Sequence, residues 1–287
     1  MTDAPTLPDG VGWTAVLVAT HRAAESLSPN PAFRDPLAEA LMVHLGLSEP
    51  GTPPDFERMP GDMAGMARMI GDVIVLRTLH YDQMIIDSGV EQIVLLGAGL
   101  DGRAYRQTWP GRRIFELDRP AGLALKEQAA AKAGVPVLTE RTAIPVDLAD
   151  DWPSALLAAG FDPSRPTAWI AEGLAVYLDR PELEALLTRA RELSAPGSRL
   201  GIELASVSPD ARSELAASDD GTRRFEGLIR SGHPVPPHDW LLDHGWTPDE
   251  LTAVELGWRY DRPVTSWLDP DRGGSALWYF SCAPVDL

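Results

Sequence analysis

From Val90 onward, the chain of 287 residues alternates short apolar runs with segments of helical periodicity. Short runs rich in Val, Ile and Leu predict buried strands, whereas apolar residues that recur every three or four positions predict helices. The predicted strands cover residues 92–97, 113–118, 137–147, 166–172, 199–205, 252–256 and 276–282. Strands that alternate with helices pair in parallel, because each parallel pair needs a crossover connection. We therefore predict an α/β fold with a mainly parallel sheet of seven strands that ends in an antiparallel pair.

The first 88 residues differ from the rest because they carry helical patterns and no strand pattern. Predicted helices cover residues 13–26 and 36–47, and one or two more cover 63–88. The alternation is also interrupted after the fifth strand, where residues 206–237 are predicted to form an insertion. We therefore expect a helical extension over residues 1–88 and a core over residues 89–287.

The composition limits the class of protein. The chain is 44% apolar, which is typical of a soluble globular protein, and no apolar run is long enough to cross a membrane. The formal net charge of −17 disfavours a nucleic-acid partner, because an acidic surface repels phosphates. The single cysteine, Cys282, can form neither an internal disulfide nor a thiolate zinc site, and no histidine pair with ligand spacing predicts a metal.

The N-terminal segment, residues 1–12, has neither the basic residues nor the apolar stretch of a secretory signal. We therefore expect a cytoplasmic protein with no membrane partner. The oligomeric state stays open between monomer and homodimer.

Glycines and carboxylates stand at the ends of four consecutive predicted strands. They are Gly97, Ala98 and Gly99 after the first strand, Glu116 and Asp118 in the second, Asp147 with Leu148 after the third, and Glu172 after the fourth. Open α/β sheets bind ligands at the carboxyl ends of their strands. A carboxylate after the second strand can accept both ribose hydroxyls, and one after the third can accept from an adenine amine. The pattern predicts a nucleoside-containing cofactor, with either Glu116 or Asp118 as the main ribose ligand.

The spacing of the glycines leaves the kind of cofactor open. Gly97, Gly99 and Gly102 match the G-x-G-x-x-G pattern, which is typical of dinucleotide-binding enzymes. On this motif alone, an NAD(P)-dependent oxidoreductase is as good an interpretation as any other. A third hypothesis is a protein that binds a cofactor without catalysis, because a fold does not fix a function.

Further motifs spread over nearly the whole chain. They are Thr14-Ala15, Arg22–Ser26, Asp35–Ala38, Arg77-Thr78, Val94–Arg106, Phe115–Asp118, Val146–Leu148, Asp151-Trp152 and Ala171–Leu174. In combination they resemble the leucine carboxyl methyltransferase family, and more closely its bacterial branch of S-adenosylmethionine-dependent methyltransferases. Gly102 departs from that pattern, since the family usually has threonine there. The first helices also lack the lysine that the eukaryotic branch places near its substrate, which disfavours a protein C-terminal leucine as acceptor.

The resemblance implies a class I methyltransferase fold, with a Rossmann-like sheet whose last strand is antiparallel, a helical cap over 1–88 and a lid over 206–237. It implies S-adenosyl-L-methionine as cofactor and a role for each strand-end residue. Arg77 would pair with the cofactor carboxylate, the Gly97-Ala98-Gly99 turn would pass under the methionine part, and Asp118 would hold the ribose. Asp147 and Leu148 would contact the adenine, and Glu172 would bind the amino group.

The acceptor implied by this interpretation is a small-molecule carboxylate or phenolic hydroxyl, in secondary metabolism. A carboxylate needs no base, whereas a phenol benefits from one. The candidates for acceptor binding or catalysis are His233, His238, Tyr177 and Arg223, with Arg224, Arg230, Tyr81 and His80 as further candidates. For the histidines and for the Arg223-Arg224 pair, an ordinary surface position is the alternative.

Overall fold

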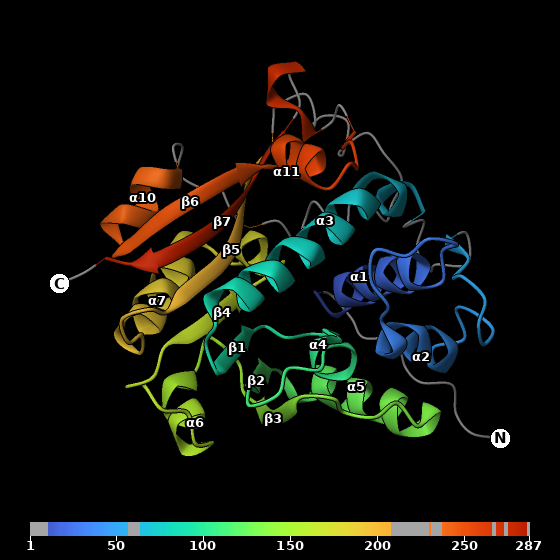
Figure 1. Ribbon diagram of the computed structural model, residues 1–287, viewed down its shortest axis with the longest axis horizontal. Coiled ribbons are helices and arrows are strands. Elements are labelled where there is room, and N and C mark those ends of the chain that lie inside the picture. Colours follow the sequence, from blue (N-terminus) through green and yellow to red (C-terminus); the bar gives the residue numbers. More distant parts are fainter. Residues whose placement is uncertain are drawn as a thin grey trace.

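A seven-stranded sheet forms the centre of the protein, in the order β3-β2-β1-β4-β5-β7-β6 (Figure 1). The computed structural model describes residues 11–56, 64–207, 230, 237–265, 268–272 and 275–285. The strands are β1 (Gln92–Leu96), β2 (Arg113–Asp118), β3 (Glu140–Pro145), β4 (Thr167–Ala171), β5 (Arg199–Ser206), β6 (Trp246–Thr252) and β7 (Ala276–Pro284). Strands β1 to β5 pair in parallel, and β7 pairs antiparallel with both β5 and β6. The predicted α/β sheet with an antiparallel end is confirmed.

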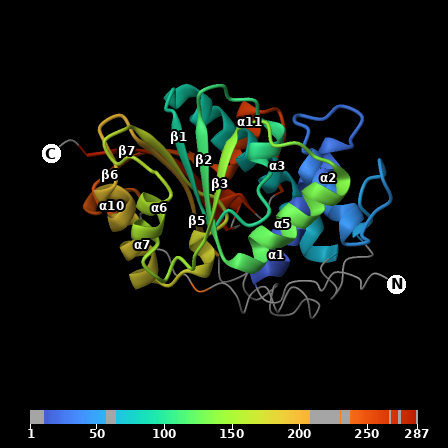
Figure 2. The same cartoon turned by 90° about the horizontal axis from the view of Figure 1, so that it is seen from below.

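Helices cover both faces of this sheet (Figure 2). They are α1 (Val11–Ser26), α2 (Pro36–His44), α3 (Ala64–Ser88), α4 (Arg103–Arg106), α5 (Pro120–Ala133), α6 (Trp152–Ala158), α7 (Arg180–Glu192), α10 (Pro237–Asp243) and α11 (Ala253–Arg259), with short 3-10 turns η2 (Ala175–Tyr177) and η4 (Pro270–Arg272). Helices α6, α7 and α10 share one hydrophobic core with the sheet. Helices α1, α2, α3, α5 and α11 share the other. The protein is thus a three-layer structure with two cores.

Strand β1 shows how the sequence produces the two cores. Ile93 and Leu95 belong to the core under α3, whereas Val94 and Leu96 belong to the core under α6 and α7. Successive side chains of a strand point to opposite faces, so a strand that is covered on both sides is mostly apolar. The one polar side chain of β1, Gln92, donates to the Asp162 carbonyl at 2.8 Å. All five residues of β1 are buried accordingly.

The prediction of a strand over residues 252–256 is wrong. Strand β6 ends at Thr252, and α11 begins at the next residue. The Thr252 hydroxyl accepts a hydrogen bond from the Glu255 N–H at 3.2 Å, and the Glu255 carboxylate accepts one from the Thr252 N–H at 2.8 Å. This reciprocal capping box starts a helix. The strand before it contains Pro248, which is tolerated because β6 lies at the edge of the sheet.

The helices α1, α2 and α3 occupy the N-terminal part of the chain. Helix α3 is continuous to Ser88 and contacts both β4 and β5. Side chains from residues 1–88 and from residues 89–287 contribute to the same hydrophobic core. The division into a cap over 1–88 and a core over 89–287 stays a prediction. The predicted lid over 206–237 falls almost entirely outside the described residues. Among the helices that the structure describes, none is both long and apolar enough to cross a membrane.

Candidate functional site

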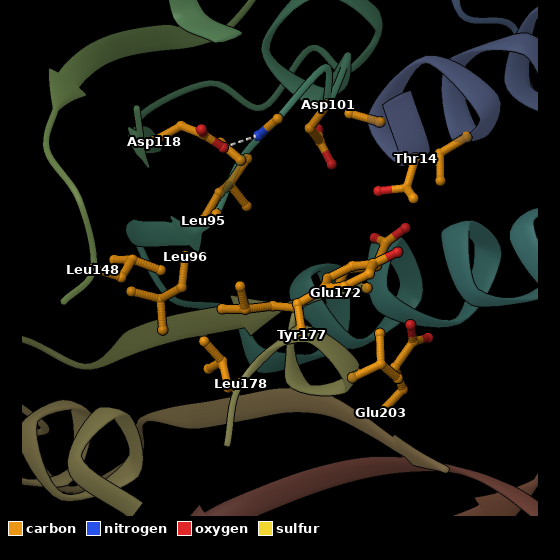
Figure 3. Close-up of a pocket in the computed structure, with 18 of the residues that line it drawn as sticks. Thr14, Leu95, Leu96, Asp101, Asp118, Leu148, Glu172, Tyr177, Leu178 and Glu203 are labelled. Atoms are coloured by element: carbon orange, nitrogen blue, oxygen red, sulfur yellow. Dashed lines mark hydrogen bonds between the residues drawn. The ribbon is translucent and has the colours of Figure 1, made fainter. Parts of the chain in front are cut away.

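A pocket of about 1010 Å³ lies at the carboxyl ends of β1, β2, β4 and β5, with α1, α3 and η2 completing its wall. Figure 3 shows Asp118 and Leu148 at one end of this pocket and Thr14 and Glu203 at the other. The eight residues predicted to bind a cofactor all line it: Arg77, Gly97, Ala98, Gly99, Asp118, Asp147, Leu148 and Glu172. The structure therefore brings together residues that are up to 95 positions apart in the sequence.

The turn after β1 requires its glycines. Gly97 and Gly99 have φ angles of +66° and +48°, which L side chains rarely adopt. A Cβ atom at Gly97 would also lie 3.1 Å from Cδ1 of Leu174. The Gly99 N–H donates to Oδ2 of Asp118, so the turn is tied to the end of β2. The backbone of the turn is thus held in place with no side chain between it and the pocket.

Asp118 and Glu116 occupy different depths of the same strand. Asp118 ends β2 and lines the pocket. Glu116 is fully buried, and its Oε2 accepts hydrogen bonds from Nζ of Lys126 and Nε of Arg141, both at 2.8 Å. Glu116 is not among the residues that line the described pocket. Of the two carboxylates that the sequence leaves open, only Asp118 is therefore presented to a ligand.

Asp147 and Leu148 follow β3 at the same end of the pocket. The Asp147 side chain is exposed, and its Oδ1 accepts a hydrogen bond from the Ala149 N–H at 3.0 Å. Leu148 is partly buried and packs against the core under α6 and α7. The pair thus offers one carboxylate and one apolar surface.

Three arginines converge on Glu172 at the other end. Oε1 of Glu172 accepts from Nη2 of Arg22 at 2.6 Å and from Nε of Arg77 at 3.0 Å. Oε2 accepts from Nη2 of Arg103 at 2.7 Å. Arg77 also donates through Nη1 to Oε1 of Glu203 at 2.8 Å. One carboxylate therefore anchors α1, α3 and α4 to the end of β4.

Among the members of this cluster that line the pocket the charges balance, although Arg103 also pairs with Asp82 outside the pocket. Three arginines face three carboxylates, and all six residues line the pocket: Arg22, Arg77, Arg103, Asp101, Glu172 and Glu203. Burial raises the pKa of Glu172, but Arg103, Arg22 and Arg77 lower it more strongly, so its pKa lies well below the usual range and the group is ionised. Burial raises the pKa of Glu203 above its usual range, because only Arg77 pairs with it directly.

Four members of the cluster were not predicted as site residues. Arg22, Asp101 and Arg103 were included only within the motifs Arg22–Ser26 and Val94–Arg106. Arg103 lies in the four-residue helix α4, which is too short for a periodic pattern, and Glu203 lies inside a predicted strand. A buried strand position that is charged is the one signal that indicates a site at Glu203, since buried charges are rarely found without a partner.

The candidates for acceptor binding are only partly brought to the pocket. Tyr177 lines it from η2 and hydrogen-bonds the Thr14 side chain of α1, and burial raises the pKa of its phenol. Arg230 also lines the pocket, where it is more than half exposed and pairs with Glu182 at 3.4 Å. His233, Arg223 and Arg224 lie outside the described residues.

The remaining candidates lie elsewhere. His238 is about half exposed at the start of α10, with Nδ1 3.5 Å from Oε2 of Glu250. His80 and Tyr81 are buried between α3 and β7, where Nε2 of His80 lies 3.4 Å from Oγ of Ser281. None of these three lines the described pocket. Within the described ranges, no group of three or more His, Cys, Asp or Glu side chains could hold a metal ion.

The order of the strands and the position of the pocket are those of the class I methyltransferase fold. The crystal structure of a methyltransferase-named protein from Thermobifida fusca superposes with a TM-score of 0.50 at 16% identity, over 93% of this chain and 94% of that one. At this identity the likeness concerns the fold alone. It extends over nearly the whole of both chains.

The family follows from the sequence. Residues 15–191 match the model of the leucine carboxyl methyltransferase family, and the chain belongs to that family. A relative from Parafrankia sp. is 41% identical over 259 residues, 89% of this chain and 83% of its own. One from Streptomyces coelicolor is 41% identical over 276 residues, 94% and 95% of the two chains. Both are named as S-adenosyl-L-methionine-dependent methyltransferases.

The predicted enzyme class and cofactor are therefore confirmed: the protein is a methyltransferase that uses S-adenosyl-L-methionine. The G-x-G-x-x-G match to dinucleotide-binding enzymes is incidental. In the structure, a Cβ at Gly102 would lie 2.3 Å from Oδ1 of Asp35, so packing against Asp35 requires a glycine there.

Proposed function

We propose that this enzyme transfers the methyl group of S-adenosyl-L-methionine to an oxygen atom of a small-molecule acceptor, a carboxylate or a phenolic hydroxyl, in secondary metabolism. The observation that carries this proposal is the size and composition of the pocket. Its volume of about 1010 Å³ is at the upper end of the range for ligand pockets, roughly 300–1,000 Å³, so it has room for an acceptor beside a cofactor.

The residues present fit the cofactor. In the proposed arrangement, Asp118 accepts hydrogen bonds from the ribose hydroxyls, and the Gly97-Ala98-Gly99 turn lies under the methionine part. The adenine is bound between Asp147 and Leu148. Two features support this assignment. Asp118 faces the pocket whereas Glu116 is covered, and Gly97 has a φ of +66° with a Cβ position only 3.1 Å from Leu174, so the turn leaves its backbone open to a ligand.

The charged cluster fits the zwitterionic amino-acid end of the cofactor. Three guanidinium groups and three carboxylates can exchange partners with one ammonium and one carboxylate without leaving a buried charge unpaired. We assign the amino group to Glu172 and the cofactor carboxylate to Arg77, with Arg22 beside it. Because Arg22 and Arg77 both donate to Oε1 of Glu172, they already lie next to each other.

The bound cofactor supplies a methyl group on a positively charged sulfur, which is an activated leaving group. The protein must hold the acceptor oxygen in line with that methyl group and exclude water. The walls contributed by Leu17, Val18 and Val73 are apolar and suit this task. A hydrogen bond between the Thr14 and Tyr177 side chains joins α1 to η2 at the pocket wall.

Calorimetry with S-adenosylhomocysteine and NADH, followed by a panel of aromatic carboxylates and phenols, tests the proposal. We expect tight binding of S-adenosylhomocysteine, no binding of NADH, and methyl transfer to an oxygen of at least one panel member, identified by mass spectrometry of the product. Methylation at nitrogen or carbon only would refute the oxygen acceptor. Binding of the cofactor with no turnover of any acceptor would favour a homologue without catalysis.

A further inference from the structure

The proposed contacts to the cofactor leave one oxygen of the Glu203 carboxylate without a partner. It lies on β5, is 4% exposed, and lines the pocket. Its Oε1 accepts a hydrogen bond from Arg77, whereas its Oε2 has no hydrogen-bond partner among the described residues. A buried oxygen without a partner costs free energy, and native proteins rarely keep one without a use. Oε1 of Glu116 also lacks a partner, but only Glu203 lines the described pocket, so its free oxygen points to a hydrogen-bond donor on a ligand.

Beyond Glu203 and Tyr279, which lie opposite each other on β5 and β7, the wall continues with apolar residues. Ala205 follows Glu203 by two residues on β5, so both side chains point to the same face and both line the pocket. Val207, just after the strand, also lines it. On the neighbouring strand β7, Leu277 lies opposite Ala205 and also lines the pocket. Figure 3 shows Glu203 at the end away from Asp118 and Leu148. This wall is thus separate from the proposed adenosine end.

The described cations near this wall are already paired. Arg22, Arg77 and Arg103 each donate to Glu172. An acceptor carboxylate at this wall would meet the Glu203 carboxylate and no free cation among the described residues, and two like charges in a buried site repel each other. A hydroxyl group can instead donate to Oε2.

We propose that this wall is the acceptor subsite and that Glu203 is the base that receives the proton of an acceptor hydroxyl group. The inference rests on the proposed function, and it narrows the acceptor to an apolar molecule with a hydroxyl group. As the acceptor oxygen forms its bond to the methyl carbon, the carbon–sulfur bond breaks and its electron pair stays on sulfur. The hydroxyl proton passes to Oε2 of Glu203, so charge and atoms balance.

The environment of Glu203 suits this role. Burial raises the pKa of Glu203, and Arg77 and the Gly173 amide only partly offset this effect. A carboxylate with a raised pKa is a stronger base than an exposed one, and it is better matched to proton transfer near neutral pH. Oε1 is held by Arg77, so we assign Oε2, which has no hydrogen-bond partner among the described residues, to the acceptor.

The test compares the wild-type enzyme with Glu203→Gln, which keeps the shape and the contact to Arg77 but cannot take up the proton. Glu192→Gln, at an exposed position near the end of α7, is the matched control. The acceptors are pairs of aromatic compounds that share a ring system and differ in carrying a hydroxyl or a carboxyl group, such as 2-naphthol and 2-naphthoate. We expect hydroxyl members to be methylated in preference to carboxyl members, and Glu203→Gln to lower kcat for them about a hundredfold or more. Affinity for S-adenosylhomocysteine should fall by much less than kcat, because Glu172 and Arg77 are the proposed contacts to its amino-acid end.

A second measurement does not depend on methyl transfer. The emission of 2-naphthol differs between its neutral and deprotonated forms, so it reports a proton acceptor at the bound hydroxyl group. In the complex with S-adenosylhomocysteine, we expect emission from the deprotonated form with wild type and with Glu192→Gln, and from the neutral form with Glu203→Gln.

Different failures point to different errors. Methylation of carboxyl members alone overturns this inference and leaves the proposed function intact. Full activity of Glu203→Gln on hydroxyl members, or loss of its S-adenosylhomocysteine affinity, also overturns the inference, because Glu203 would then not be the base or would serve the cofactor. Absence of any oxygen methylation overturns the proposed function and this inference together.

Discussion

At the scale of single residues, the surroundings of a carboxylate decide its use. Glu116 and Asp118 lie two positions apart, and the spacing alone places both on one face of β2. The structure separates them, because Lys126 of α5 and Arg141 of β3 cover Glu116. Which of two carboxylates faces a ligand depends on neighbours from other elements, and the sequence spacing carries no such information.

We predict that Asp118→Asn lowers the affinity for S-adenosylhomocysteine. The substitution removes the charge that strengthens the two proposed ribose contacts, at a cost of about 2 kcal/mol, which is roughly thirtyfold in Kd. Isothermal titration calorimetry measures this, with the exposed residue Asp243→Asn as the control that should keep wild-type affinity. Equal affinity of both variants would show that the ribose lies elsewhere.

At the scale of elements, strands and helices with a strong pattern were predictable. Strand β2 has the predicted bounds, and α5 ends where Gly134 takes a left-handed conformation. Strand β6 and helix α4 were missed for different reasons. Strand β6 contains a proline and acidic residues, which are rare in strands, so its sequence does not predict one. Pairing with β7 stabilises the strand in spite of this composition. Helix α4 has only four residues, so tertiary contacts determine it.

The candidate site was predictable where it follows the strand ends and unpredictable where side chains cross between elements. The glycine turn and Asp118 follow from the position of the strands. The pairing of Arg103 with Glu172 joins residues 69 positions apart. Such a contact depends on how α4 packs against β4, which no local pattern determines.

An ion-pair network joins α3 to α4, and we predict that it is needed for stability. Oδ1 of Asp82 accepts from Nε of Arg103 at 2.7 Å and from Nη2 of Arg106 at 2.9 Å. Asp82→Asn leaves two buried arginines short of one negative charge, and breaking buried pairs costs about 3–5 kcal/mol. Chemical denaturation should show a loss of this size, whereas Asp87→Asn, exposed on the same helix, should change little. A loss below about 1 kcal/mol for Asp82→Asn would mean that Asp101 and Glu172 suffice to hold Arg103.

At the scale of the whole molecule, two cores share one sheet. A histidine buried on one face of that sheet makes the free energy of unfolding depend on pH. His80 lies where α3 packs on β7. Its pKa is lowered from 6.5 to about 4: burial has the largest effect, Arg259 adds to it, and Asp249 opposes it. Since the folded protein takes up a proton at His80 less readily than the unfolded chain, acid favours unfolding.

We predict that the free energy of unfolding falls as the pH is lowered from 6.5 to about 4, the window between the two pKa values of His80. Below the folded pKa both states are protonated, so this contribution then stays constant. At 1.36 kcal/mol for each pH unit, the loss from this residue is about 3 kcal/mol. Denaturation curves of wild type and His80→Gln across this window measure the difference. Parallel pH dependences would assign the effect to other groups.

The position of β7 has a consequence for synthesis. This strand lies between β5 and β6, although both precede it in the chain. A polypeptide emerging from the ribosome can therefore pair β1 to β5 while its later residues are still being made, but β6 has no neighbour until β7 arrives. Leu277, at the start of β7, is also part of the pocket wall. The cofactor-binding half of the enzyme can thus take shape during translation, whereas the wall proposed for the acceptor is completed only when the last strand is in place.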